Sequence, residues 1–183
     1  MNFKPIDLSF TIDTDLFHLD VKEAETLHFH CRGEKGSITI FCPKDTQFDV
    51  GEFQSWFRKV VREALRREAK LIFPERLEKW SGKTGLKYKR LSIHCTSSKW
   101  GSYSSLGNLN LSLYLLLLDS RFVDYTMCHE LCHSKEMNHG PRFWTLLESH
   151  LGPDARKLSR EMARTARQWY KEGDPRYLLI TNA

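Results

Sequence analysis

His129-Glu130-Leu131-Cys132-His133 is the stretch of sequence that decides the fold, because its histidines require a helix and its apolar neighbours require that helix to be buried. Two histidines four residues apart on a helix lie about 40° apart around the axis and roughly 6 Å apart along it, so both imidazoles share one face. Glu130 lies between them. This H-E-x-x-H arrangement is typical of zinc hydrolases, and it predicts that His129 and His133 are metal ligands and that Glu130 is a general base.

A third ligand is expected, because a catalytic zinc takes three protein ligands and keeps a fourth position for water or substrate. His139 is the candidate, and five residues separate it from His133, as in metzincin proteases. Glu136 stands where those proteases have glycine, so the turn must be made differently, and Asn138 and Gly140 are the residues best able to make it. The sequence therefore predicts a three-histidine site for Zn²⁺, with another divalent metal as the alternative.

Five short motifs follow one another in the second half of the chain. They are WGS at 100–102, GNLNL at 107–111, VDY at 123–125, HELCH at 129–133 and NHGPRFW at 138–144. Together they resemble the YgjP-like metallopeptidase family, which is related to the SprT-like zincins, and the resemblance runs from about residue 50 to residue 170. Two positions depart from that family's pattern: Tyr103 stands in place of a cysteine and Gly140 in place of a serine.

The resemblance implies a metal-dependent hydrolase of the zincin type, with ligands at His129, His133 and His139 and the catalytic acid/base at Glu130. The substrate stays open, because members of the family are described both as peptidases and as nucleotide pyrophosphatases that act on UTP. We expect a metallopeptidase, with the pyrophosphatase as the alternative. A metal-stabilised nucleic-acid-binding module is the third hypothesis, and Glu130 argues against it because a structural zinc site has no use for a base.

The candidate substrate-binding residues are Trp100, Gly101, Ser102 and Asn110. Trp100 either lines the cleft or anchors its loop by packing, and Gly101 and Ser102 offer backbone groups to the site. Asn110 lies in a predicted strand, 108–112, which is our candidate for the edge strand that pairs with an extended substrate. The alternative is an ordinary structural strand.

Periodicity predicts an α+β, zincin-like fold. Alternating apolar residues over 5–43 predict an N-terminal antiparallel β meander with a hairpin around Gly33 to Gly36. Residues 49–80 have helical periodicity, which Pro74 should interrupt. Predicted strands at 88–95 and 108–113 form a small mixed sheet packed on helices, and the later helices are the H-E-x-x-H helix to about residue 134, a helix from 141 to 150 and one from 154 to about 172. We expect one domain, 1–183, with an N-terminal β part (1–48), a metallopeptidase core (49–172) and a C-terminal tail (173–183).

Composition indicates a soluble cytoplasmic protein with a single core. A length of 183 residues suits one domain, and residues 1–10 have no apolar run that would make a secretory signal. The longest apolar stretch, 113–118, is too short to span a bilayer, so no membrane partner is expected. Five cysteines, an odd number without a C-x-x-C pair, fit a reducing compartment. Of these, Cys128 and Cys132 are expected to be buried thiols behind the site rather than ligands.

The net charge of +5 slightly favours polyanions. Arg58, Arg62 and Arg66 recur along one helical face, and further arginines follow in the last helix. Such a run is usually a solvated face, and it is also the first place to test if a nucleotide or a nucleic acid is the partner.

Overall fold

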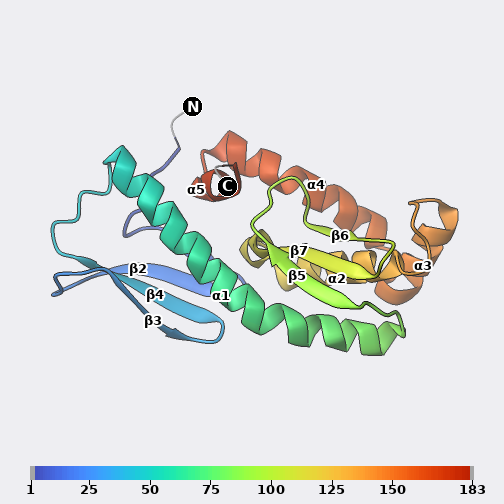
Figure 1. Ribbon diagram of the computed structural model, residues 1–183. Helices are drawn as coiled ribbons and strands as arrows, with labels where there is room; N and C mark the ends of the chain where they lie inside the picture. Colours follow the sequence, from blue (N-terminus) through green and yellow to red (C-terminus); the bar gives the residue numbers. More distant parts are fainter. Residues whose placement is uncertain (1–2, 182–183) are drawn as a thin grey trace.

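Helix α1, Gly51–Thr84, runs the length of the molecule, and one sheet lies beside each of its halves (Figure 1). The computed structural model describes residues 3–181, which form an α+β fold with two small mixed sheets. Apolar residues recur at three- and four-residue spacing from Phe57 to Leu77, so they share one face of α1. This face points into the core, where these residues are buried. Side chains from both sheets and from the later helices belong to the same hydrophobic core.

Pro74 does not interrupt α1, so the predicted break is wrong. Proline removes one helical hydrogen bond and crowds the preceding turn. Phe73 and Leu77, on either side of it, are both 0% exposed, so their packing in the core keeps the helix continuous through Pro74. The helix ends instead at Gly85, which takes the left-handed conformation (φ 72°) and donates its N–H to the carbonyl of Ser81.

The N-terminal sheet is mixed, which corrects the predicted meander. Its strands are β1 (Thr11–Asp13), β2 (His18–Ala24), β3 (His30–Glu34) and β4 (Ser37–Pro43), in the order β1-β2-β4-β3. The hairpin is confirmed: β3 and β4 are antiparallel across a turn at Gly36. However, β4 pairs with β2 in parallel. Alternation reveals the buried face of a strand and not its partner, and here the more apolar β4 takes the centre while the polar β3 lies at the edge.

The second sheet contains β5 (Arg90–His94), β6 (Gly101–Tyr103) and β7 (Asn108–Ser112), in the order β5-β7-β6. The strand at 108–112 is therefore central, and its prediction as the edge strand is wrong. It pairs in parallel with β5 and antiparallel with β6. Leu109 and Leu111 explain this position, because their burial at 0% and 1% exposure ties β7 to the core. The two edges are formed by β5 and by β6, which is only three residues long.

The helices that follow pack around helix α2, which carries the H-E-x-x-H motif. After the 3₁₀ turn Leu113–Leu117, α2 (Ser120–Cys132) contacts α1, β6 and β7, and it also packs against α3 (Pro141–Leu151) and α4 (Ala155–Glu172). These three helices agree closely with the prediction. A last helix, α5 (Pro175–Thr181), was not predicted within the tail, and its Leu179 and Ile180 are buried. Residues 182–183 of that tail lie outside the described residues.

Within residues 3–181, no helix is both long enough and apolar enough to cross a membrane.

Asp124 fastens α2 to α1. Its carboxylate accepts two hydrogen bonds from Arg76, at 2.6 and 2.8 Å, and a third from the Trp80 indole N–H at 2.7 Å. The Arg76 and Asp124 side chains are about a quarter exposed, at 26% and 27%. Two parallel charge-assisted hydrogen bonds between a guanidinium and a carboxylate stabilise the contact and also fix the relative orientation of the two groups. This contact therefore holds the motif-bearing helix α2 in position against α1.

We expect Asp124→Ala to lower the free energy of unfolding by about 2–3 kcal/mol, because it leaves the Arg76 guanidinium without its partner. Glu63→Ala is the matched control, since Glu63 pairs with Arg66 at the surface, where its side chain is 69% exposed. Losing that pair should cost less than about 1 kcal/mol. Urea unfolding of both variants measures the difference. Equal losses would show that Asp124 does not anchor α2.

Candidate metal centre

Three histidine rings converge beside the C-terminal end of α2. The helix places His129 and His133 one turn apart on the same face, and the chain then turns back to bring His139 against them. Their ligand nitrogens all lie within 4.8 Å of one another. The Nε2 atoms of His129 and His139 are 2.9 Å apart. The structure thus brings together the three histidines that the sequence singled out.

The outer nitrogens of two rings are engaged by neighbours, and for His133 the neighbour decides where the proton lies. Nδ1 of His133 is 3.0 Å from the carbonyl oxygen of Glu136. A carbonyl only accepts, so Nδ1 carries the proton and Nε2 keeps a free lone pair. The Tyr125 hydroxyl lies 3.1 Å from Nδ1 of His129 and can hold that ring in the same way. Such outer partners orient metal-binding histidines.

Neither of these partners was assigned from the sequence. Glu136 makes its contact through its backbone carbonyl. Tyr125 makes the other contact, through its hydroxyl. Its position four residues before His129 was the available signal, because i and i+4 side chains meet on a helix.

Burial keeps the imidazoles of His129 and His133 neutral. Removal from water, with His133 and His139 close by, lowers the pKa of His129 to about 3. Burial also lowers the pKa of His133 below its ordinary value. Both rings are therefore neutral at neutral pH, with one ring nitrogen left free, which is the form that binds a metal.

Phe143 forms the floor of the cluster. Its ring centroid lies 4.8 Å from that of His129 and 4.7 Å from those of His133 and His139, and its side chain is 0% exposed. Pro141 at the first turn of α3 starts the helix that presents this ring.

Glu130 is a buried carboxyl group beside the cluster, and it is only 6% exposed. Burial raises the pKa of Glu130 to about 8, against an opposing effect from Lys99. Strand β6 passes directly over it at Gly101. A Cβ on Gly101 would lie 2.7 Å from Cγ of Glu130 and 2.8 Å from Oε1, closer than real contacts allow. Glycine at 101 is therefore what lets the edge strand approach this carboxyl group.

The other candidate residues lie around the same strand. Trp100 packs against the core. Asn110 donates to the Ser102 hydroxyl at 3.1 Å and lies 3.1 Å from Nε2 of His94. Side chains alternate along a strand, so Ser102 points to the sheet face opposite that of Gly101. Of the four substrate-binding candidates, Gly101 is thus the one that contacts Glu130.

The two cysteines of α2 are buried, at 0% exposure for both Cys128 and Cys132. Within residues 3–181, the group of side chains placed to hold a metal consists of the three histidines alone. The thiols pack behind the site, as predicted.

The donor set fits a divalent cation. Zn–N bonds of about 2.0–2.1 Å at tetrahedral angles put two ligand nitrogens about 3.3 Å apart, and the Nε2 atoms of His129 and His139 are already 2.9 Å apart. Lone pairs at neutral imidazoles are ligands for zinc, copper, iron or nickel. Three imidazoles beside a buried carboxyl group form the arrangement that a metal-dependent hydrolase requires.

The comparison with protein families agrees with this class. The chain belongs to the YgjP-like family, because the family model described as "YgjP-like, metallopeptidase domain" matches residues 16–165, most of its length. No curated protein and no solved structure matches the chain. The family and the histidine cluster together indicate a metal cofactor.

Proposed function

We propose that this protein is a zinc-dependent peptidase of the zincin type, in which His129, His133 and His139 hold the metal and Glu130 is the general base. The observation that carries the proposal is the convergence of three imidazoles next to a buried carboxyl group, over which edge strand β6 passes at Gly101. The family name supports the reaction class.

A dication at the three imidazoles supplies Lewis-acid chemistry, which polarises a scissile carbonyl and makes water more acidic. Glu130 takes the proton of the attacking water on a carboxylate oxygen and returns it to the leaving amine. In the metal-free protein burial raises the pKa of Glu130, and a nearby cation favours its charged form. Its burial keeps bulk water from competing for this proton.

The free edge of β6 suits an extended peptide. Ser112 donates its N–H to the carbonyl of Trp100, and Ser104 donates to that of Asn108, both at 2.9 Å. In an antiparallel pair the intervening residues point their backbone groups away from the partner, so those of Gly101 and Tyr103 face the open edge. A substrate strand that pairs there lies beside Glu130. This assigns to β6 the role that the sequence suggested for residues 108–112.

Gly101→Ala should reduce peptide turnover by about 100-fold, because the new Cβ displaces either Glu130 or the edge strand by a fraction of an ångström to an ångström. Gly82→Ala is the matched control, since a Cβ on Gly82 meets nothing within 4 Å. That variant should keep full turnover and gain helix stability of up to about 1 kcal/mol. Steady-state kinetics with zinc-loaded proteins provide the comparison. Unchanged turnover in Gly101→Ala would show that the close approach of β6 does not fix the catalytic position of Glu130.

A nucleotide pyrophosphatase is the second candidate function, and the observation that favours it is a group of lysines near the metal ligands. Lys87, Lys89 and Lys135 line a pocket that also includes His133, and lysines can hold phosphates. The decisive experiment incubates the zinc-loaded protein with unstructured casein peptides and, separately, with UTP. Cleavage of peptides alone supports the peptidase, and release of pyrophosphate from UTP alone supports the alternative.

A further inference from the structure

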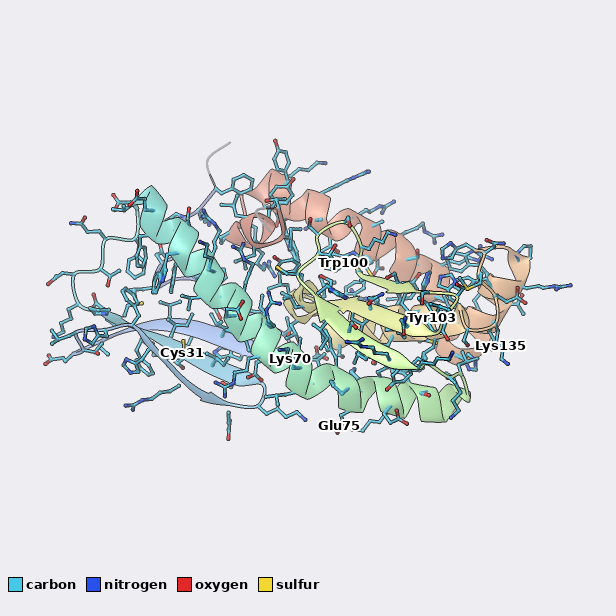
Figure 2. The ribbon with its side chains drawn as sticks, viewed as in Figure 1. Cys31, Lys70, Glu75, Trp100, Tyr103 and Lys135 are labelled. Carbon is cyan, nitrogen blue, oxygen red and sulfur yellow. The ribbon has the colours of Figure 1, made fainter. Side chains whose placement is uncertain are left out.

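A pocket of about 440 Å³ opens directly beside the metal ligands, and the proposed reaction does not use it. Three segments line it: the linker from α1 to β5 (85–89), the end of β6 with its turn (103–107), and the segment after α2 (133–137). Because His133 belongs to its wall, the pocket borders the candidate metal centre. Figure 2 shows Tyr103 and Lys135, which both line it, at the end of the molecule where α3 lies.

The pocket is basic. Lys87, Lys89 and Lys135 contribute to its lining, and no aspartate or glutamate does. Within residues 3–181, lysines form ion pairs at Lys22, Lys35, Lys44 and Lys79, and so not at any of the three pocket lysines. Three cations without carboxylate partners around one hollow favour an anionic occupant.

A polar atom inside the lining also lacks a partner. The hydroxyl oxygen of Ser134 is buried and makes no hydrogen bond, although buried hydroxyl groups are normally satisfied. Ser134 directly follows the ligand His133, and other atoms of this residue belong to the pocket's lining, so the unpartnered hydroxyl lies behind that wall.

The walls are held in place by other contacts. The Tyr103 hydroxyl donates to the Lys87 carbonyl at 2.9 Å, which joins β6 to the linker and fixes the ring between them. The side chain of Lys89 lies across Gly107, where a Cβ would come within 3.1 Å of its Cγ. Leu106 and Met137, 69% and 50% exposed, form an apolar rim. A strongly basic hollow with an apolar rim suits a side chain that is both aliphatic and acidic.

We propose that this pocket selects substrates in which an acidic side chain, aspartate or glutamate, lies within a few residues of the scissile bond. The inference rests on the proposed peptidase function. A peptide paired with β6 passes Gly101 and then Tyr103, and its side chains alternate between the two faces of the extended strand. Those on the α2 side meet Tyr103 and Lys135, so a carboxylate there reaches the pocket lysines.

The test uses matched peptides, acetylated and amidated at their ends, that differ only by glutamate or glutamine at one position, which is moved along the peptide. Binding is measured by fluorescence anisotropy with the zinc-loaded Glu130→Gln protein, and cleavage with the zinc-loaded protein that retains Glu130. At one position, the glutamate peptide should bind about tenfold more tightly, in line with charge-assisted hydrogen bonds. This ratio should fall as salt is added.

Two variants assign the preference to the pocket. In the Glu130→Gln background, Lys135→Glu should remove the preference for glutamate or reverse it toward a lysine peptide. Lys70→Glu is the control with the same charge change, since Lys70 is exposed on the middle of α1, well apart from Lys135 in Figure 2. It should leave the ratio unchanged. An otherwise identical glutamine peptide with a free C-terminal carboxylate separates recognition of a chain end from recognition of a side chain.

Equal binding of glutamate and glutamine peptides at every position would overturn the pocket's assignment. So would tight UTP binding that Lys135→Glu abolishes while peptide binding stays the same, because the lysines would then serve phosphates. Preference for glutamate in the binding assay, without cleavage of any peptide by the zinc-loaded protein, would support the pocket and contradict the peptidase function. The two failures are therefore distinguishable.

Discussion

Replacing Glu130 with glutamine should reduce turnover by the zinc-loaded protein about 10²–10⁴-fold, the usual contribution of a general acid–base group. Glutamine has nearly the same shape, so it fits the buried place beneath Gly101, but it cannot accept and return a proton. The three histidines are untouched, and metal content should stay at one zinc per chain. Peptide kinetics and elemental analysis of the same preparation measure the two quantities.

Glu136→Gln is the matched control for this substitution. Glu136 lies between the ligands His133 and His139 in sequence, and it serves the site through its backbone carbonyl, which the substitution leaves in place. The variant should keep both metal and turnover. Full activity in Glu130→Gln would show that another group moves the proton.

His139→Ala should lower zinc affinity by more than about 100-fold and abolish turnover. Loss of an outer partner of a ligand already costs about 10–100-fold, and this substitution removes a ligand itself. His139 is the exposed member of the cluster, so its loss should leave the fold intact. Competition with a chromophoric chelator measures the affinity, and circular dichroism checks the fold.

His94→Ala removes another exposed histidine, one that contacts Asn110 rather than the cluster, and it should bind zinc normally. Treatment of the unsubstituted protein with a chelator should abolish its activity, and added zinc should restore it. Zinc binding by His139→Ala as tight as in the unsubstituted protein would exclude a three-histidine site.

The candidate site was predictable because most of it is local in sequence. The spacing of His129 and His133 on a helix fixes their shared face, whatever the rest of the chain does. His139 follows within one short turn, and Phe143 comes four residues later, on the helix that Pro141 begins. Short-range geometry of this kind depends on helix periodicity alone. The family match over residues 16–165 is consistent with the motifs from which the resemblance was stated.

Strand order was less predictable, because it depends on contacts between distant residues. The alternation of Ile38 and Ile40 showed which face of β4 is buried, but not that β2 is its parallel neighbour. In the same way, the pattern of residues 108–112 fits either a central or an edge strand. Its place was decided by β6, a three-residue strand too short to stand out by periodicity.

Pro74 and the backbone partner of His133 show two further limits. Helix propensity placed a break at Pro74, and the buried side chains of Phe73 and Leu77 overrode it. The carbonyl of Glu136 carries no signature in the sequence, because every residue has one. The extent of the domain, 1–183, and a cytoplasmic location remain predictions from the sequence.

The central claim is that three imidazoles hold one zinc ion. X-ray absorption at the zinc edge, on protein loaded with one equivalent, tests it most directly. We expect only nitrogen and oxygen scatterers at about 2.0–2.1 Å, with the outer-shell pattern of three imidazole rings that falls to two in His139→Ala. Sulfur at about 2.3 Å, the distance for a cysteine such as Cys128 or Cys132, or a full set of four protein ligands would contradict the account.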